Sequence, residues 1–392
     1  MSVPDGYKAT EVGVIPVDWE VRTLREVCRQ IVDGTHFTPT YTREGVPFYS
    51  VENVTANDFK HVKFISIKDH ELQNKRCNPE RGDILMTRIG SLGDTRFIDW
   101  DVKASIYVSL ALLKVGEGID PCFLYAYSRS HDFRQSVENR SLMSAVPKKI
   151  NMGAIGDVPV PVPPTDAEQA AVAEVLSDVD EAIAAVDAVI AKKRVLKTAT
   201  MQALLSGTRR LPGFSGEWEA VNLGAIAHIK TGSRNNEDKQ PDGKYPLFVR
   251  SQHVERINTY SYDEEAILVP GEGGVGSIFH YINGKFDCHQ RVYKISQFAN
   301  NMHGHFVYFS MVHGFGSHAM QNTVKATVDS LRLPTFKAFR FLAPSKKEQD
   351  AIAQLILDLD NELADQVANL AKLRRLKAGM MQQLLTGKIR LV

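Results

Sequence analysis

The fold is decided by a stretch that occurs twice, EQAAVAEVLSDVDEAIAAVDAVIAKKRVLKTATMQALLSGTRRL at 168–211 and EQDAIAQLILDLDNELADQVANLAKLRRLKAGMMQQLLTGKIRL at 348–391. The two copies align without a gap at an offset of 180 residues, and 20 of the 44 positions are identical. Weaker similarity continues outside them, since DWEVRTLREV at 18–27 resembles EWEAVNLGAI at 217–226. An internal repeat of this kind predicts a chain in the order globular, helical, globular, helical.

Both copies have the pattern of a long amphipathic helix. They lack proline, carry glycine near their ends, and place apolar residues three and four positions apart. A Glu at 168 or 348 follows a Thr or Ser cap by three residues, which predicts each helix start. Gly207 and Gly387 predict the ends. Because each helix has its own apolar stripe, we expect the two helices to form a coiled-coil pair.

Charge is separated along each helix. Residues 168–191 contain six acids and no base, whereas 192–211 contain six bases and no acid. Residues 348–371 and 372–392 repeat this split. The helix dipole favours such a bias but does not require complete separation over about six turns. An antiparallel pair brings the acidic half of each helix against the basic half of the other, and a parallel pair brings like charges together. We therefore predict an antiparallel pair.

The rest of the chain predicts two globular domains of mixed structure. Short β-rich runs such as GDILMTRI at 82–89 and EAILVPG at 265–271 are separated by Gly, Pro, Asn and Asp. The expected fold class is α+β, with two mixed, mainly antiparallel-β domains joined by two long antiparallel helices in a pseudo-twofold repeat. The expected boundaries are 1–165 for the first domain, 166–207 for the central helix, 208–345 for the second domain and 346–392 for the C-terminal helix.

The composition excludes several classes of protein. Hydrophobic residues make up 43% and charged residues 24% of 392 residues, and no apolar run approaches the roughly 20 residues that span a bilayer. The N-terminus lacks a signal-peptide pattern, so a cytoplasmic protein is expected. Four cysteines without metal-ligand spacing predict reduced thiols. The net charge of +1 does not decide for or against a polyanionic partner.

The catalytic motifs we searched for are missing or out of context. GEGGVG at 271–276 matches a dinucleotide-binding loop, but strand-like SIFHYI follows it where a helix is required, so a glycine-rich β-turn is favoured. The sequence contains no H-E-x-x-H zinc motif and no G-x-S-x-G elbow. We therefore expect a protein that binds and does not catalyse, with no metal and no cofactor.

Loops with basic or amide side chains are the candidate nucleic-acid contacts, because Lys and Arg bind phosphates, while Arg, Asn, Gln and His read base edges. Each one alone is also consistent with an ordinary surface residue. In the first domain these candidates are His36, Thr38, Lys60, Lys63, Arg88, Arg96, Lys148, Lys149 and Asn151. In the second domain they are Lys230, Arg234, Asn235, Arg250, Gln252, His253, Arg256 and Lys325.

The chain resembles the DNA specificity (S) subunit of type I restriction-modification systems. The resemblance is carried by GYKATEVGVIPVDWE at 6–20, DGTHFTP at 33–39, RGDILMTRIGSLG at 81–93 and the doubled helix with its LLSG or LLTG ending. It implies two target-recognition domains that read the two halves of a split sequence in double-stranded DNA. It also implies that the helices act as a spacer and bind two methylation (M) subunits, and that restriction (R) motor-nuclease subunits join the complex. Methyl transfer and cleavage would then belong to those partners.

Two rival classes stay open from the residues alone. A fused restriction and methylation enzyme would need a catalytic domain, for which a chain filled by the repeat leaves no room. A coiled-coil adaptor without a DNA role would explain the helices but not two divergent globular domains. A helix of about 40 residues is roughly 60 Å long, enough to hold two domains more than one DNA turn apart.

Overall fold

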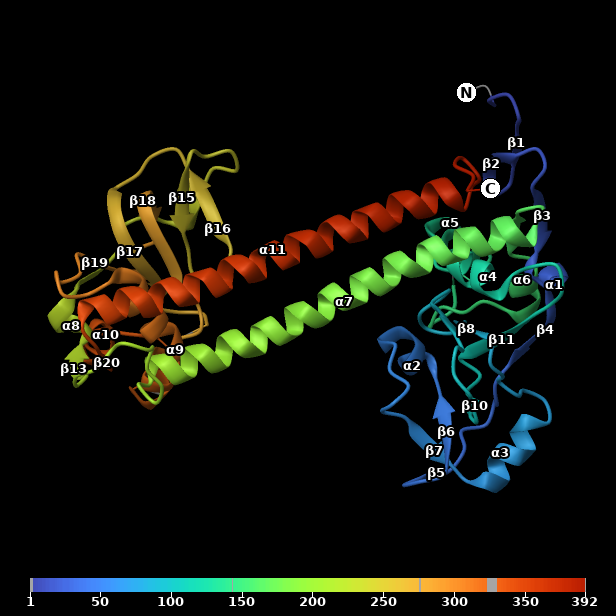
Figure 1. Cartoon of the computed structure of the whole chain (residues 1–392), viewed down its shortest axis with the longest axis horizontal. Coiled ribbons are helices and arrows are strands. Elements are labelled where there is room, and N and C mark those ends of the chain that lie inside the picture. The colour runs from blue at the N-terminus through green and yellow to red at the C-terminus, as the bar shows by residue number, and fades with distance from the viewer. Residues whose placement is uncertain (1–2, 143, 275, 323–329, 392) are drawn as a thin grey trace. The chain divides into compact units, whose positions relative to one another are not determined.

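The computed structural model describes residues 3–142, 144–274, 276–322 and 330–391 (Figure 1). It contains two long helices, α7 (Asp166–Leu205) and α11 (Lys346–Leu384). The chain divides into two compact units: unit 1 comprises Met1–Val186 and Asn369–Val392, and unit 2 comprises Asp187–Ala368. Each unit therefore combines one globular domain with one half of each long helix. None of the helices in the described ranges has the length and apolarity needed to span a membrane.

Unit 1 contains two four-stranded sheets and two short strand pairs. Its strands are β1 (Tyr7–Thr10), β2 (Gly13–Pro16), β3 (Glu20–Thr23), β4 (Cys28–Asp33), β5 (Tyr41–Thr42), β6 (Val46–Tyr49), β7 (Lys63–Ile65), β8 (Ile84–Thr87), β9 (Thr95–Phe97), β10 (Ser105–Ile106), β11 (Leu110–Val115) and β12 (Pro159–Val162). One sheet is antiparallel in the order β4-β11-β8-β9. The other has the order β10-β6-β7-β5, with β10 parallel to β6. The pairs are β1-β2 and β3-β12.

The first sheet of unit 1 is buried on both faces, which is why β11 is apolar at every position except Lys114, whose ammonium pairs with the carboxylates of Asp83 and Glu80. Ile84 and Leu113 contribute to a core shared with the helices, and Leu85 and Leu112 contribute to a second core on the other face. The short helices are α1 (Leu24–Val27), α2 (Val51–Ala56), α3 (Ile67–Asn74), α4 (Pro121–Ser128), α5 (His131–Asn139) and α6 (Met152–Gly156). Side chains of α4 and α5 pack into the first core together with Val172 of α7.

Unit 2 repeats this plan with one six-stranded sheet. Its strands are β13 (Glu219–Asn222), β14 (His228–Thr231), β15 (Tyr245–Phe248), β16 (Val254–Ile257), β17 (Tyr262–Pro270), β18 (His280–Cys288), β19 (Val292–Ser296) and β20 (Arg340–Ala343). The sheet order is β14-β19-β17-β18-β15-β16, and β13 pairs with β20. Its helices are α8 (Leu223–Ile226), η1 (Asn236–Asp238), α9 (Gly304–Asn322) and α10 (Leu333–Ala338). Strand β15 lies parallel to β18, as β6 does to β10.

The two long helices run antiparallel within each unit, as the charge pattern predicted. In unit 1, Asp180 of α7 pairs with Lys377 of α11 at 2.5 Å. In unit 2, Lys193 of α7 pairs with Glu362 of α11 at 2.5 Å. The predicted fold class, α+β with two mixed domains and two antiparallel helices in a repeat, is confirmed.

Helix α7 ends at Leu205 and α11 ends at Leu384. Gly207 and Gly387 adopt φ values of 71° and 65°, a left-handed conformation that glycine tolerates and that terminates a helix. These glycines were the predicted stop signals, and α7 and α11 stop at Leu205 and Leu384.

Candidate nucleic-acid interface

Both globular domains begin their first surface loop with a glycine pressed against the sheet. A Cβ atom at Gly34 would lie 2.0 Å from the carbonyl oxygen of Ile106, and one at Gly232 would lie 2.1 Å from that of Cys288. Real Cβ atoms do not approach so closely, so only glycine allows the loop to leave β4 or β14 at this point. The two loops, 34–40 and 232–243, therefore occupy equivalent positions in the two units.

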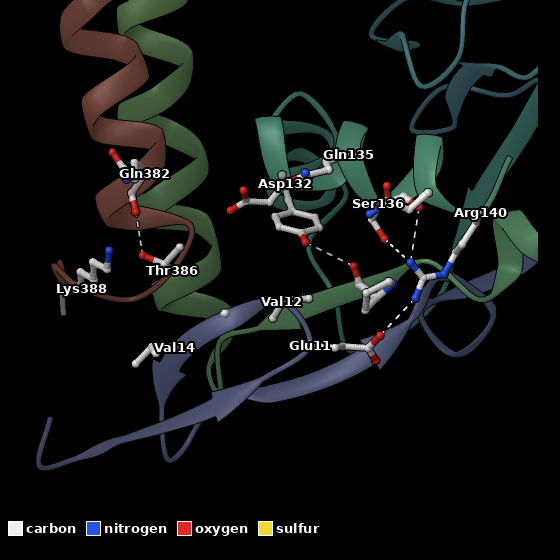
Figure 2. Close-up of a pocket in the computed structure, with 14 residues that line it drawn as sticks. Glu11, Val12, Val14, Asp132, Gln135, Ser136, Arg140, Gln382, Thr386 and Lys388 are labelled. Carbon is white, nitrogen blue, oxygen red and sulfur yellow. Dashed lines mark hydrogen bonds and ion pairs between the residues drawn. The ribbon is translucent and has the colours of Figure 1, made fainter. Parts of the chain in front are cut away.

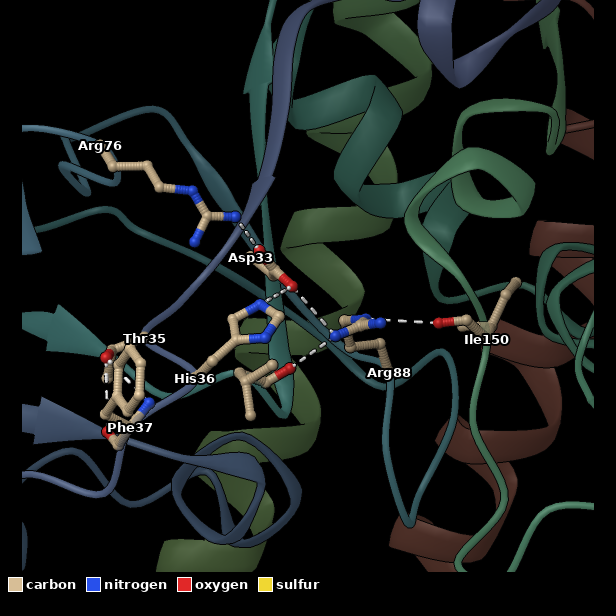
Figure 3. A network of polar contacts seen from close by, with 8 residues as sticks. Asp33, Thr35, His36, Phe37, Arg76, Arg88 and Ile150 are labelled. Carbon is tan, nitrogen blue, oxygen red and sulfur yellow. Dashed lines mark hydrogen bonds and ion pairs between the residues drawn. The ribbon is translucent and has the colours of Figure 1, made fainter.

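In unit 1 the loop is tied down by the buried carboxylate of Asp33 (Figure 3). The side chain of Asp33 is only 4% exposed. Its Oδ2 atom lies 3.2 Å from Nη1 of Arg88 and 2.9 Å from Nε2 of His36. Its Oδ1 atom accepts a hydrogen bond from Arg76. One carboxylate thus holds three cationic or titratable side chains, which we call the Asp33 network.

Arg88, one of the predicted DNA contacts, lies in the interior of unit 1. The residue is 7% exposed, and its guanidinium also donates to the carbonyls of Val108 at 2.9 Å and Ile150 at 3.3 Å. Burial lowers the pKa of Arg88, and the charge of Asp33 opposes that shift. Arg88 therefore positions three chain segments against one another, in place of the surface role assigned to it from the sequence.

Several other predicted residues gather around the Asp33 network. Lys148 and Lys149 are exposed, and the Lys148 carbonyl accepts a hydrogen bond of 2.9 Å from the amide of Gly90 in the glycine turn. Asn151 is exposed at the start of α6. The Thr38 hydroxyl lies 3.2 Å from the hydroxyl of Tyr107. The structure thus brings the loops at 33–38, 88–93 and 147–151 together.

Three predicted residues of unit 1 lie outside this network. Lys60 is exposed in the turn before β7. Lys63 lies in β7 with its ammonium 4.9 Å from the ring centroid of Tyr41. Arg96 lies in β9, 3.2 Å from the carboxylate of Asp99, with a side chain 26% exposed. In the described part of unit 1, the polar contacts of Lys63 and Arg96 are to Tyr41 and Asp99, which are not members of the Asp33 network.

In unit 2 a buried carboxylate again anchors the equivalent loop. Asp287 is fully buried and accepts a hydrogen bond of 2.7 Å from Nε of Arg234. This hydrogen bond raises the pKa of Arg234. Arg234 also donates to the hydroxyl of Thr259 at 3.2 Å, and the neighbouring Asn235 accepts a hydrogen bond of 2.6 Å from Gln290. The loop is therefore preorganised, and Arg234 is partly engaged in holding it.

The second predicted cluster of unit 2 lies between β15 and β16. Arg250 lies 3.3 Å from the carboxylate of Glu272, which also pairs with Arg291. Gln252 and His253 are exposed, and the ring of His253 lies 3.8 Å from Glu255.

Arg256, Lys230 and Lys325 complete the predicted set. The guanidinium of Arg256 donates to the carbonyls of Gly243 and Lys244, both at 2.9 Å, and so stabilises the turn before β15. The ammonium of Lys230 lies 4.9 Å from the ring centroid of Tyr262. Lys325 lies outside the described residues.

The GEGGVG segment is a connection between strands, as predicted. Strand β17 ends at Pro270 and β18 begins at His280. Gly273, Gly274 and Gly276 have positive φ values between 68° and 77°, whereas Val275 lies outside the described residues. A phosphate-binding loop of the dinucleotide type would open a helix at this point, and here a strand follows.

Unit 1 also contains a polar hollow of about 450 Å³ between the β1-β2 hairpin, α5 and the end of α11 (Figure 2). Two of its charged groups pair within it, since Arg140 lies 3.1 Å from Glu11 and also donates to the hydroxyl of Ser136 at 2.6 Å. Within the described ranges, no group of three or more His, Cys, Asp or Glu residues is placed to hold a metal ion.

The sequence reasoning missed the carboxylates of Asp33, Glu272 and Asp287. Phosphate contacts are made by cationic side chains, so an acidic residue in the sequence gives no sign that it belongs to such a site. One signal was present for Asp33, because it directly precedes the glycine that opens the loop. For Asp287 no local signal existed, since Arg234 is 53 residues away along the chain.

The repeated domain and repeated helix define a class of protein with two equivalent binding modules in one chain. The family model described as the type I restriction modification DNA specificity domain matches residues 16–192 and, a second time, residues 215–373. The chain belongs to this family and carries its domain twice.

Relatives with this organisation are divergent in sequence. A specificity subunit assigned to the MjaX type I restriction enzyme of Methanocaldococcus jannaschii is 23% identical over 98% of this chain and 97% of its own. The EcoDI specificity subunit of Escherichia coli is 28% identical over 43% of this chain and 37% of its own. The crystal structure of the type I S subunit from M. genitalium superposes with a TM-score of 0.67 at 16% identity, covering 98% of both chains. At that identity the superposition shows a shared fold.

Proposed function

We propose that this chain is the non-catalytic, DNA-reading subunit of a type I restriction-modification complex. Each globular domain reads one half of a bipartite target in double-stranded DNA, and the helices set the spacing between the halves. The observation that carries this proposal is the repeat of one anchored surface loop, opened by Gly34 in unit 1 and Gly232 in unit 2. Two equivalent domains suit two separated half-sites on a duplex whose backbone is itself twofold symmetric.

The side chains that surround the two loops support a difference in sequence preference. His36, Lys148 and Lys149 are exposed in unit 1, whereas Asn235, Gln252 and His253 are exposed in unit 2. Lysine binds phosphates without regard to sequence, while amide and imidazole groups recognise base edges. Because the anchoring is similar and the exposed side chains differ, each domain is expected to recognise its own half-site.

The partners follow from the family rather than from any contact in this chain. We propose that the helices bind two methylation subunits, and that restriction subunits join the same complex in the cytoplasm. S-adenosylmethionine and ATP chemistry then belong to those partners, and this chain alone transfers no methyl group and cuts no DNA. Methyl transfer by the purified single chain would contradict this part of the proposal.

An exchange of one domain tests the proposal directly. Residues 19–163 are replaced by the corresponding segment of a relative, and the methylated bases of the host genome are mapped with the wild-type gene, the hybrid gene and no gene. We expect one half of the methylated sequence to change while the other half and the spacer stay the same. If both halves change together, the domains are not independent readers. If methylation does not depend on this gene, a coiled-coil adaptor becomes the better assignment.

A point variant gives a finer test within the second domain. Gln252→Ala removes an exposed amide and is expected to cost about 1–3 kcal/mol of specific binding and to relax one base position if Gln252 reads a base edge. Asn235→Ala, which removes an exposed amide from the loop anchored by Asp287, is measured in the same way for comparison. A loss that is uniform across sequences would instead assign Gln252 to the sugar-phosphate backbone of the DNA.

A further inference from the structure

Two apolar side chains of unit 1 stand out among its large hydrophobic residues by their exposure. Phe37 is 84% exposed and Val146 is 99% exposed, the highest values among the large hydrophobic residues that the structure describes. Single exposed apolar residues are common and need no explanation by themselves. These two, however, both lie on loops that the Asp33 network joins, since Arg88 bonds to Asp33 on one side and to the Ile150 carbonyl on the other.

The loop that carries Phe37 is held on both sides of the ring. His36 is bound to Asp33 at 2.9 Å, and the Thr38 hydroxyl lies 3.2 Å from the hydroxyl of Tyr107. The hydroxyl of Thr35, two residues before the ring, accepts a hydrogen bond from the amide of Phe37 and donates one to its carbonyl, both at 3.3 Å. The exposed ring is therefore presented by a loop with hydrogen bonds before and after it, and Figure 3 shows those that His36 and Thr35 make.

The surroundings of Phe37 are concave and carry positive charge. A hollow of about 620 Å³ is lined by Phe37, Leu72, Ile106 and Arg76, among others. Leu72 is 69% exposed, and the side chains of Arg76 and His36 are 59% and 58% exposed. Both side chains bond to the carboxylate of Asp33, which is buried beneath them. An apolar ring beside an exposed guanidinium and an exposed imidazole fits a ligand whose exterior is anionic and whose interior is flat and apolar, as double-stranded DNA is.

We propose that Phe37 is a specificity-determining residue that contacts the bases of the first half-site through its ring. The inference rests on the proposed DNA-reading function. Arg76 lies beside the ring, where its exposed guanidinium can meet a phosphate, while the Asp33 network fixes the direction in which the ring enters the groove. Two base contacts suit a phenyl ring: the methyl group of a thymine in the major groove, or a base step that the ring partly unstacks.

The test uses the full chain in complex with the methylation subunits of its host and a duplex that contains the target mapped from the host genome. Phe37→Ala is expected to weaken binding to this target about tenfold and to leave binding to a scrambled duplex, and the salt dependence, unchanged. Val17→Ala is the matched control, because Val17 is a 57% exposed apolar residue that follows the β1-β2 hairpin of the same unit. The high exposure of both side chains makes a folding defect in either variant unexpected.

Two sets of duplexes distinguish the kinds of base contact. In the first set, each thymine of the half-site is replaced in turn by uracil, which removes only the methyl group. In the second, adenines are replaced by 2-aminopurine, whose fluorescence rises when the base is unstacked. The inference is supported if the wild-type complex loses affinity at one uracil position, or raises the fluorescence at one base step, and the Phe37→Ala complex does not show the same effect.

Other outcomes overturn either this inference or the proposed function. If Phe37→Ala binds the target as tightly as wild type and Val17→Ala, or loses target and scrambled DNA equally, Phe37 does not read bases. If the wild-type complex itself fails to prefer the mapped target over the scrambled duplex, the DNA-reading function fails instead.

Discussion

The carboxylate of Glu168 accepts two hydrogen bonds from the guanidinium of Arg390, at 2.7 Å from Nε and 2.6 Å from Nη2. The same arrangement joins Glu348 to Arg210, at 3.0 Å and 2.5 Å. Both carboxylates are buried, whereas the arginine side chains are 36% and 27% exposed. Each pair connects the first turn of one long helix to the segment that follows the other. We call them the two glutamate locks.

A glutamine follows each locked glutamate and fastens the preceding loop. Gln169 donates to the carbonyl of Pro163 at 3.1 Å, and its amide oxygen accepts from the backbone of Asp120. Gln349 donates to the carbonyl of Pro344 at 2.8 Å and accepts from the backbone of His303. The Glu-Gln pair at the start of each repeat thus ties a globular domain to a helix in both units.

Breaking a glutamate lock should destabilise the unit that contains it. In Arg390→Met the buried carboxylate of Glu168 loses its cation, which should lower the free energy of unfolding by about 3 kcal/mol. This value is at the low end of the range for breaking a buried ion pair, because Arg390 is partly exposed. Urea denaturation followed by circular dichroism measures the change. Glu168→Leu combined with Arg390→Met should recover most of the loss, because no buried charge is left unpaired. The control is Arg25→Met, whose pair with Asp157 is more than 60% exposed on both sides. A similar loss in both single variants would contradict the importance of the lock.

The antiparallel pairing of the helices predicts a charge reversal that can be rescued. Lys193 pairs with Glu362 at 2.5 Å and Lys197 pairs with Asp360 in unit 2. Changing both lysines to Glu should place like charges together and reduce stability by about 1 kcal/mol, since each partly exposed pair contributes roughly 0.2–1 kcal/mol. Adding Glu362→Lys and Asp360→Lys should restore the melting temperature. A fourfold variant that melts no higher than the double variant would show that these residues do not face each other.

The tight approach at Gly34 predicts a strong effect of a single methyl group. Gly34→Ala would force the Cβ into the carbonyl of Ile106, and such overpacking should cost about 1–3 kcal/mol of stability. Gly153→Ala is the matched control, because a Cβ at Gly153 in α6 meets nothing within 4 Å. This control should be neutral or stabilise unit 1 by about 0.4–1 kcal/mol. Equal melting temperatures for the two variants would mean that the loop can shift to accept a side chain.

Thiol labelling should distinguish one cysteine from the other three. All four are free, and burial raises the pKa of Cys28, Cys77 and Cys288 to about 12. Those thiols are therefore almost entirely protonated at pH 7, and the thiolate is the reactive form. Cys122 is exposed, although partial burial and two nearby aspartates raise its pKa as well. We expect one thiol per native chain to react with Ellman's reagent and four in urea. Cys122→Ser should remove the native reaction, and more than one reactive thiol in the native chain would contradict the burial of the others.

The helices, their direction and the repeat were predictable because their signals are local or linear in the sequence. Apolar spacing of three and four residues defines a helix face wherever it occurs. The complete separation of acids from bases on 168–211 and 348–391 is compatible with only one pairing direction. The glycines that end the helices were recognisable for the same reason, since a left-handed cap requires little beyond its own residue.

Tertiary structure alone decided which of the predicted cations are exposed and which are buried. Arg88 and Lys148 look equally suitable in the sequence, yet Arg88 lies beside the Asp33 carboxylate, 55 residues away along the chain, while Lys148 is exposed. Arg234 is likewise engaged by Asp287, and Arg256 by two carbonyls of a turn. The physical reason is that a guanidinium is held by hydrogen bonds to whichever carboxylate or carbonyl the fold brings within about 3 Å, and its burial depends on the same neighbours. Such partners are set by strand order, which residue spacing does not record.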